Sequence, residues 1–196
     1  MSQKQYHHGD LKQDLIQKGI QLLAREGYDG FSLRKLAALC GVSHAAPYKH
    51  FQSKEDIIAE IGKVIAVEFS QALHHAVSLH PEDQRQQLIA MCHAYVRFMV
   101  EHPDYFRFVF MTSHQRPIEV EGGSIKAGNR QPLDIALGTV KNYFGKLKGD
   151  GWQQDFLALW SMMQGYVLML VCGTIDPGKE YLAPIQTMVE GYLDRQ

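Results

Sequence analysis

The sequence lacks the short patterns that identify known enzyme chemistries. Its 196 residues contain no HExxH, GxSxG or Walker pattern and no dinucleotide-binding glycine pattern. Ten histidines are present, but His74 and His75 fall in the middle of a helical pattern with no suitably spaced partner ligand. We therefore expect no catalytic residue, no metal ion and no cofactor.

Cysteine is scarce, and its spacing excludes two further kinds of site. Cys40, Cys92 and Cys172 are odd in number, far apart and embedded in apolar helical patterns. They form neither a disulfide framework nor a CxxC metal site, so we expect buried, reduced thiols. The N-terminus is polar and has no apolar secretory run. Together these features predict a cytoplasmic protein.

Long hydrophobic runs are also missing. The apolar segment 156–172 is shorter than the roughly 20 residues that a bilayer core needs, and Ser161, Gln164 and Gly165 interrupt it. We predict a buried helix and no membrane contact. Because such a helix must be covered on all sides, the simplest cover is its neighbours plus the same helix of a second subunit, in a four-helix bundle.

Residues 31–56 carry the most informative positive signal. Ser32 is a good N-cap, apolar residues follow it at helical spacing, and Gly41 stands where a residue without Cβ can end a helix. Ser43 is a second N-cap, which predicts about two turns of helix from His44 to Phe51. Two short helices joined by a tight turn are the layout of a helix-turn-helix, whose second helix enters the DNA major groove.

The second of these helices carries side chains that suit a duplex. Small residues at its start let the backbone approach the bases, and basic, imidazole and phenolic groups can donate to phosphates or base edges. These side chains belong to His44, Ala45, Ala46, Tyr48, Lys49 and His50. Ser53 then caps a third helix, with Asp56 at the N3 position of a capping box, and Lys54 adds a positive charge there.

Residues 9–60 resemble the N-terminal DNA-binding domain of the TetR/AcrR family of bacterial transcriptional regulators. The resemblance rests on the ordered motifs Gly27-Tyr28, Ser32, Leu36-Ala37, Gly41-Val42-Ser43, Tyr48-Lys49-His50-Phe51 and Lys54-Glu55-Asp56-Ile57. It implies DNA contacts by Ser32, Ser43, His44, Ala45, Tyr48, Lys49, His50 and Lys54. It also implies a homodimer on a near-palindromic operator in double-stranded DNA, with repression as the default.

Pro47 departs from the family pattern, which usually has Leu, Ile or Thr there. A proline at this place removes one backbone hydrogen bond of the second helix, so we expect the helix to begin distorted or one residue later. Ala46, which precedes the proline, is expected to be extended.

Charge is divided unevenly along the chain. The first 54 residues contain eight Lys or Arg and four Asp or Glu, a net charge of +4. Since the whole chain has a net charge of −1, residues 55–196 carry a net charge of −5. A basic N-terminal part on an acidic body suits a protein that meets phosphate with one end only.

The rest of the chain is predicted to be helical throughout, which makes the fold all-α. We expect a DNA-binding domain over 1–55, with its helix-turn-helix at about 32–51, and a regulatory and dimerisation domain over 56–196. The expected helices cover 11–27, 54–79, 81–102 (opened by Pro81), 103–111 (opened by Pro103), 132–148, 152–174 and 181–195, with a long mobile loop over 112–131. The last two helices are expected to form the dimer interface.

Residues 156–173 resemble the C-terminal regulatory domain of a TetR/AcrR subset that carries Trp-x3-His-Gly, although Trp160 is followed here by Gln164-Gly165. The resemblance implies a pocket for a small-molecule inducer. Candidate pocket residues, chosen as aromatic, sulfur and neighbouring polar side chains, are His93, Tyr95, Phe98, Met99, Phe106, Phe110, Trp160, Met163, Gln164 and Tyr166. A mostly apolar ligand would suit them.

Two other function classes remain open at this point. An enzyme could use His93 or His102 with a cysteine or a carboxylate, and a helical adaptor could have lost DNA binding. Salt-sensitive DNA binding that depends on Tyr48 and Lys54 separates a regulator from both.

Overall fold

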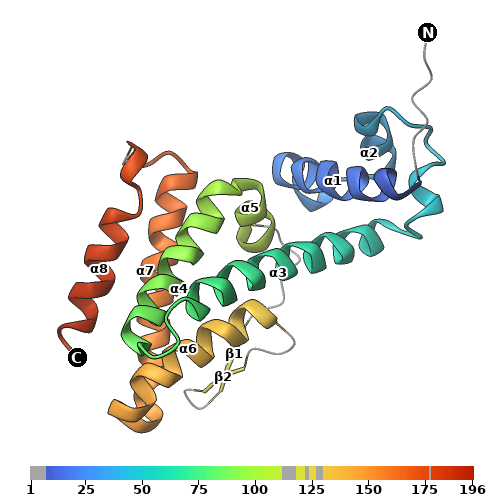
Figure 1. The fold of residues 1–196 in the computed structure, drawn as a ribbon. Helices are drawn as coiled ribbons and strands as arrows, with labels where there is room; N and C mark the ends of the chain where they lie inside the picture. The colour runs from blue at the N-terminus through green and yellow to red at the C-terminus, as the bar shows by residue number, and fades with distance from the viewer. Residues whose placement is uncertain (1–7, 112–117, 122–123, 127–129, 177) are drawn as a thin grey trace. The chain divides into compact units, whose positions relative to one another are not determined.

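The computed structural model describes residues 8–111, 118–121, 124–126, 130–176 and 178–196, and it is dominated by α-helices, as predicted (Figure 1). In chain order the elements are α1 (His8–Gly30), α2 (Leu33–Cys40), the 3₁₀ helix η1 (Pro47–Lys49), α3 (Lys54–Ser78), α4 (Gln84–Glu101), α5 (Pro103–Met111), β1 (Glu119–Glu121), β2 (Ser124–Lys126), α6 (Gln131–Lys148), η2 (Gly149–Gly151), α7 (Trp152–Val171), η3 (Gly178–Glu180) and α8 (Ala183–Leu193). No helix in these described ranges is both long enough and apolar enough to cross a bilayer.

The chain divides into two compact units. The described residues of the first fall within 1–65 and 104–115, and those of the second within 66–103 and 116–196. The division falls inside α3, whose 25 residues belong partly to each unit.

The first unit is built around a close approach of α1 and α3. A Cβ added at Gly19 would lie 2.8 Å from Cδ1 of Ile61, which is fully buried, so only glycine fits here without a shift. The regular part of α1 ends at Gly27, whose φ of 69° is the left-handed conformation that glycine adopts most readily. The predicted end of this helix near residue 27 is therefore confirmed, and one further turn follows to Gly30.

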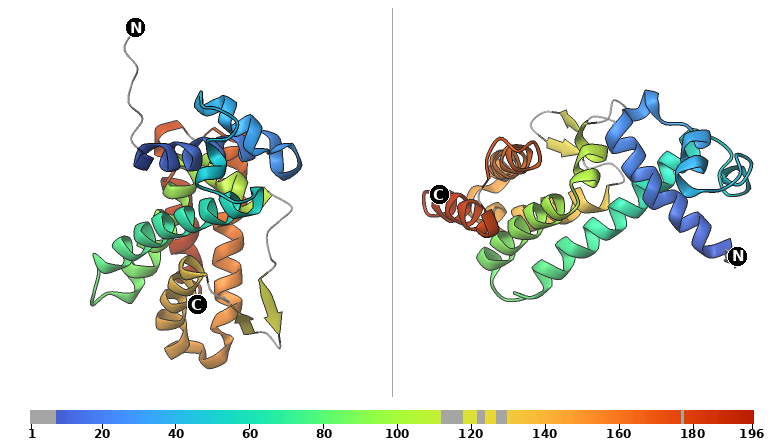
Figure 2. Two further views of the ribbon diagram at one scale, coloured as in Figure 1. Left: turned by 90° about the vertical axis from the view of Figure 1, so that its right-hand side faces the viewer. Right: turned by 90° about the horizontal axis from the view of Figure 1, so that it is seen from above.

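The second unit is a helical bundle. Figure 2 shows α4, α6 and α7 side by side, and α8 contacts both α4 and α7. Apolar side chains fill the centre, among them the fully buried Leu88, Cys92, Met99, Phe144, Leu159, Val167, Ile185 and Val189. Burial raises the pKa of the Cys92 thiol to about 12, so this cysteine is an inert core residue.

A buried carboxylate ties three helices of this bundle together. Asp155 on α7 is 3% exposed, and its Oδ1 accepts from Nζ of Lys148 on α6 at 2.9 Å and from the hydroxyl of Tyr192 on α8 at 2.7 Å. Burial, together with the bond to Asp155, raises the pKa of Tyr192 to about 12. The charge of Asp155 is thus matched by one cation and one hydroxyl donor.

Three predictions about these regions are wrong. Pro81 does not open α4, because the carboxylate of Asp83 caps the helix instead, accepting from the Gln86 amide at 2.9 Å. Part of the predicted loop over 112–131 is a short antiparallel hairpin in which Val120 pairs with Ile125; residues 112–117, 122–123 and 127–129 lie outside the described residues. Cys172 is exposed just beyond the end of α7, although Cys40 and Cys92 are buried as expected.

Candidate nucleic-acid interface

The first helix of the predicted helix-turn-helix forms as its sequence indicates. Ser32 is extended (φ −149°, ψ 150°), and its Oγ accepts from the Lys35 amide at 3.2 Å. At the other end Gly41 adopts the left-handed conformation (φ 69°, ψ 29°), and the amides of Gly41 and Val42 bond to the last carbonyls of α2. Both caps are as predicted.

The recognition segment is shorter than predicted. No two-turn helix runs from His44 to Phe51; a turn closed by the Ala46 amide on the Ser43 carbonyl (2.9 Å) leads into η1, which covers only Pro47–Lys49. The reason is Pro47, which has no amide hydrogen for a longer ladder and takes the first position of the new helix. The recognition element is therefore a turn of 3₁₀ helix.

The prediction that Ala46 is extended is also wrong. Its φ of −61° and ψ of −44° are helical, and it joins two successive turns: its amide donates to the Ser43 carbonyl at 2.9 Å, and its carbonyl accepts from the Lys49 amide at 3.2 Å. The preference of a residue before proline for extended backbone is outweighed by these two hydrogen bonds and by the burial of Pro47.

The start of α3 is capped as expected, with one shift in register. The Ser53 Oγ accepts from the Asp56 amide at 3.2 Å. The Asp56 carboxylate bonds back to the amide of Gln52 at 3.0 Å, one residue before the cap. The capping pair fixes where α3 begins and so where Lys54 stands.

The eight predicted DNA contacts fall into two groups. Ser43, His44, Ala45, Tyr48 and Lys49 are exposed, and the Tyr48 side chain is the most open of the aromatic residues here at 59%. Ser32, His50 and Lys54 are half-buried. Of these, Ser32 uses its hydroxyl for the α2 cap, and the His50 ring lies 6.4 Å from that of Phe51.

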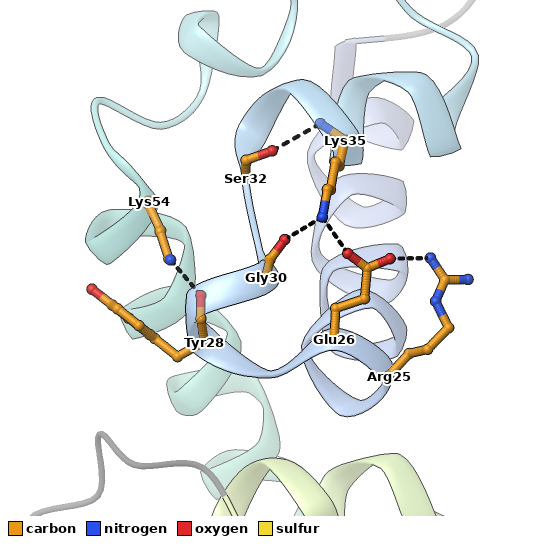
Figure 3. Close-up of polar contacts among 7 residues, drawn as sticks. All are labelled: Arg25, Glu26, Tyr28, Gly30, Ser32, Lys35 and Lys54. Atoms are coloured by element: carbon orange, nitrogen blue, oxygen red, sulfur yellow. Dashed lines mark hydrogen bonds and ion pairs between the residues drawn. The ribbon is translucent and has the colours of Figure 1, made fainter.

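Most cations of residues 8–65 are already paired within the protein. Ion pairs join Lys12 to Glu60, Lys18 to Asp14, Arg25 and Lys35 to Glu26, and Lys63 to Glu60. Lys54 donates to the Tyr28 carbonyl (Figure 3). Among the described lysines and arginines of residues 8–65, only the exposed Arg34 and Lys49 have no such partner for their side chains.

Arg34 was missed by the sequence reasoning. It stands second in α2 and is exposed, beside the buried face formed by Leu33, Leu36 and Ala37. The helical spacing of the apolar residues in α2, which leaves position 34 off the buried face, combined with the Ser32 cap, was the signal that could have found it.

Comparison with known proteins places these features in one family. Residues 15–61 match the model of bacterial regulatory proteins of the tetR family, and residues 88–192 match the tetracyclin repressor-like C-terminal domain. The chain belongs to the TetR family. It is 23% identical over 168 residues to the uncharacterized HTH-type transcriptional regulator Rv0681 of Mycobacterium tuberculosis, covering 84% of this chain and 72% of that protein.

Solved TetR-type structures share the fold. A TetR-like transcriptional regulator from Rhodococcus sp. RHA1 superimposes with a TM-score of 0.74 at 13% identity, covering 98% of this chain and all of that one. The transcriptional regulator FadR of Bacillus subtilis, solved in complex with stearoyl-CoA, gives 0.66 at 15% identity, with 91% and 95% covered. The likeness to these structures is one of fold.

The predicted effector residues do not all lie in one unit. His93, Tyr95, Phe98 and Met99 on α4 and Trp160, Met163, Gln164 and Tyr166 on α7 belong to the second unit. Phe106 and Phe110 on α5, whose rings lie 5.2 Å apart, belong to the first. A surface depression in the second unit lies elsewhere, where α6 meets α7, and includes Lys141, Lys146 and Trp152.

Within the second unit, the buried Tyr95 and the half-buried Gln164 form a hydrogen-bonded pair. The Tyr95 hydroxyl donates to Oε1 of Gln164, and burial raises the pKa of this tyrosine far above its ordinary value. Phe69 on α3, which the sequence reasoning did not include, lies 5.5 Å from the Tyr95 ring and 4.9 Å from that of Phe98. Gln164 thus stands where the TetR/AcrR subset with Trp-x3-His-Gly has its histidine, and its side chain accepts a hydrogen bond from the Tyr95 hydroxyl.

His93 gives the stability of this unit a predicted dependence on pH. Burial lowers its pKa, Arg97 lowers it further and Glu190 opposes the shift, while Nε2 is buried with no partner among the described residues. A histidine whose pKa is lower when folded stabilises the protein above its unfolded pKa of about 6.5, and this stability is lost as the pH falls through the folded value. We expect the free energy of unfolding to fall between pH 7.5 and 5.

The test is urea unfolding at several pH values for the wild type, His93→Gln and a control, His75→Gln, which changes an exposed histidine on α3. The dependence should be shallower in His93→Gln and unchanged in His75→Gln. Equal slopes for all three proteins would contradict the role of His93.

Proposed function

We propose that this TetR-family regulator is a cytoplasmic repressor that binds a near-palindromic operator as a homodimer and is released by a small-molecule effector. The observation that carries the proposal is the exposed set Tyr48, Lys49 and Arg34, held on a capped helix-turn-helix whose other cations are paired internally. In a dimer, two such sets address two half-sites one helical turn apart.

The roles of these side chains follow from their chemistry. The guanidinium of Arg34 and the ammonium of Lys49 can each bind phosphate or the acceptor edge of guanine, and the Tyr48 hydroxyl can donate to phosphate. Ser43, His44 and Ala45 precede η1 on the same exposed stretch and bring backbone, hydroxyl and imidazole groups to the duplex. Because η1 is only one turn long, we expect few side chains to read bases.

The proposed dimer interface uses α7 and α8. Large apolar side chains on these helices remain exposed in the single chain, namely Leu157 at 38%, Leu168 at 41%, Met169 at 39% and Met188 at 37%. An apolar patch of this kind is typical of an interface between subunits.

The proposed effector is apolar with one or more polar groups. The aromatic and sulfur side chains on α4 and α7 and the hydrogen bond between Tyr95 and Gln164 support this class. FadR, which shares the fold, binds stearoyl-CoA, whose long acyl chain agrees with an effector that has an apolar part. Release would follow if the ligand favours a spacing of the two helix-turn-helix units that no longer fits successive grooves.

DNA binding is tested by selecting duplexes from a random pool and measuring the affinity of the selected sequence by fluorescence anisotropy at several salt concentrations. We expect near-palindromic sequences and an affinity that falls steeply with salt. The logarithm of the association constant falls with the logarithm of the salt concentration, and each phosphate contact adds about 0.9 to the steepness of this fall. Arg34→Ala or Lys49→Ala removes two contacts per dimer and should therefore reduce the steepness by about 1.8.

Lys179→Ala is the matched control, because Lys179 is an exposed lysine in the second unit, outside the proposed nucleic-acid interface. It should bind as the wild type does. If no duplex is selected at low salt, the proposal of a repressor is rejected in favour of a helical adaptor that has lost DNA binding.

A further inference from the structure

Tyr28, at the end of α1, is held at three places by the first turn of α3. Its carbonyl accepts from the Lys54 ammonium, its ring face lies 3.8 Å from the same Nζ, and its hydroxyl donates to Oε1 of Glu55 at 2.9 Å. We infer that Lys54 is a positioning residue that fixes the helix-turn-helix on α3, and that it makes no phosphate contact of its own. We call Tyr28, Lys54 and Glu55 the clamp.

The last turn of α1 needs such a partner because Gly27 breaks the helix. Gly27 (φ 69°, ψ −178°) kinks α1, and the helix ends at Gly30, so the carbonyls of residues 28–30 have no amide four residues later in the same helix. The Tyr28 carbonyl accepts from the Phe31 amide at 3.2 Å, and Lys54 adds a second, charged donor. A charged donor on a helix-terminal carbonyl is stronger than a neutral one.

A second lysine holds the same turn from the other side, as Figure 3 shows. Nζ of Lys35 on α2 donates to the Gly30 carbonyl at 2.8 Å and pairs with Glu26 at 2.6 Å. The hydrogen bond from Lys35, and then that from Arg25, lowers the pKa of Glu26, so this carboxylate stays ionised and keeps Lys35 in place. The turn after Gly27 is thus fixed by α2 and α3 together.

The contrast between Lys54 and Lys49 supports a difference in role. Lys54 is half-buried, with its ammonium on a carbonyl and an aromatic face, whereas Lys49 is exposed and its ammonium has no partner within the described segments. A phosphate that recruited Lys54 would have to displace or share these contacts, and Lys49 has none to lose. Phosphate binding therefore falls to Lys49 and Arg34.

Loss of the clamp should misplace the recognition turn without removing a phosphate contact. The helix-turn-helix would then reach the groove in a wider range of orientations, and affinity would fall by a similar factor at every salt concentration. This effect on the salt slope distinguishes a positioning residue from a phosphate-binding one.

The inference rests on the proposed function, and one experiment separates their failures. Operator affinity is measured at four salt concentrations for the wild type, Lys54→Met, Tyr28→Leu, their double variant, Lys54→Arg and the matched control Lys49→Met. Stoichiometric titration and circular dichroism give the folded, active fraction of each. Tyr28→Phe, which keeps the ring and loses only the bond to Glu55, serves if Tyr28→Leu does not fold.

We expect Lys54→Met and Tyr28→Leu each to weaken binding about tenfold, as for loss of a hydrogen bond to a charged group, with the wild-type salt slope. The double variant should be no weaker than the weaker single variant, since both remove one unit. Lys54→Arg should restore affinity, and Tyr28→Phe should weaken it a few-fold at constant slope. Lys49→Met should lower the slope by about 1.8.

Two results overturn the inference while leaving the proposed function intact. One is a fall in slope for Lys54→Met equal to that for Lys49→Met. The other is wild-type affinity in the folded Tyr28 variant with independent effects in the double variant. Failure of the wild type to bind any duplex would instead reject the proposed function, and the inference with it.

Discussion

Leu36→Ala is expected to destabilise the helix-turn-helix by about 3 kcal/mol, as for other fully buried leucines cut back to alanine. Leu36 is 0% exposed at the centre of α2, in the core that α2 shares with α1. The substitution removes buried apolar surface and leaves a cavity that the capped ends of α2 cannot close, since Ser32 and Gly41 fix the helix in place. Operator affinity should fall with the folded fraction.

The matched control for this prediction is Leu39→Ala, the same substitution three residues further along α2. Leu39 is 39% exposed, so its loss should cost less than about 1 kcal/mol. Amide hydrogen exchange of the α1 and α2 backbone in the full chain measures the opening free energy of this region for both variants. Similar costs at the two positions would show that the buried face of α2 has been wrongly assigned.

Lys148→Met is expected to destabilise the second unit by about 3 kcal/mol, because it leaves the buried Asp155 carboxylate without its cation. Among the residues that the structure describes, only the Tyr192 hydroxyl would remain as a donor to that charge. Removing one partner of a buried ion pair costs more stability than removing both, so a second variant is informative. Lys148→Met combined with Asp155→Asn removes both charges and keeps an oxygen for Tyr192, so most of the lost stability should return.

A double-mutant cycle tests whether Lys148 compensates the charge of Asp155. It uses urea unfolding of the wild type, Lys148→Met, Asp155→Asn and the double variant. The expected interaction free energy is large and favourable, with the double variant more stable than Lys148→Met alone. Additive effects of the two substitutions would show that Lys148 does not compensate the charge of Asp155. Lys146→Met, on the same last turn of α6 and exposed, is the control for loss of a lysine there.

The caps and most helix ends could be predicted because they depend on neighbouring residues. Ser32, Gly41 and Ser53 act on amides and carbonyls within a few positions of themselves, so the sequence around each contains the whole interaction. Where two local preferences competed, prediction failed. At Ala46 the preference before proline lost to a turn hydrogen bond, and at Pro81 the expected helix start lost to the Asp83 cap.

The candidate site was predicted in part, and the remainder depended on distant partners. The exposure of Tyr48 and Lys49 agrees with the roles that the resemblance implies. Lys54 looked equivalent to Lys49 in the sequence, since nothing near it in the chain reveals a contact with Tyr28, 26 residues earlier. The effector candidates were chosen by residue type alone, and side-chain type does not say which compact unit a residue joins, as Phe106 and Phe110 illustrate.

The sequence by itself determined an all-α chain with a capped helix-turn-helix near its N-terminus, because caps, breaks and apolar spacing act over one or two helical turns. The tertiary structure alone decided which cations of the helix-turn-helix lack an internal partner and how the charge of Asp155 is matched. It also decided that the α1 end is clamped by Lys35 and Lys54. These depend on residues tens of positions apart, whose meeting is fixed by packing of the core.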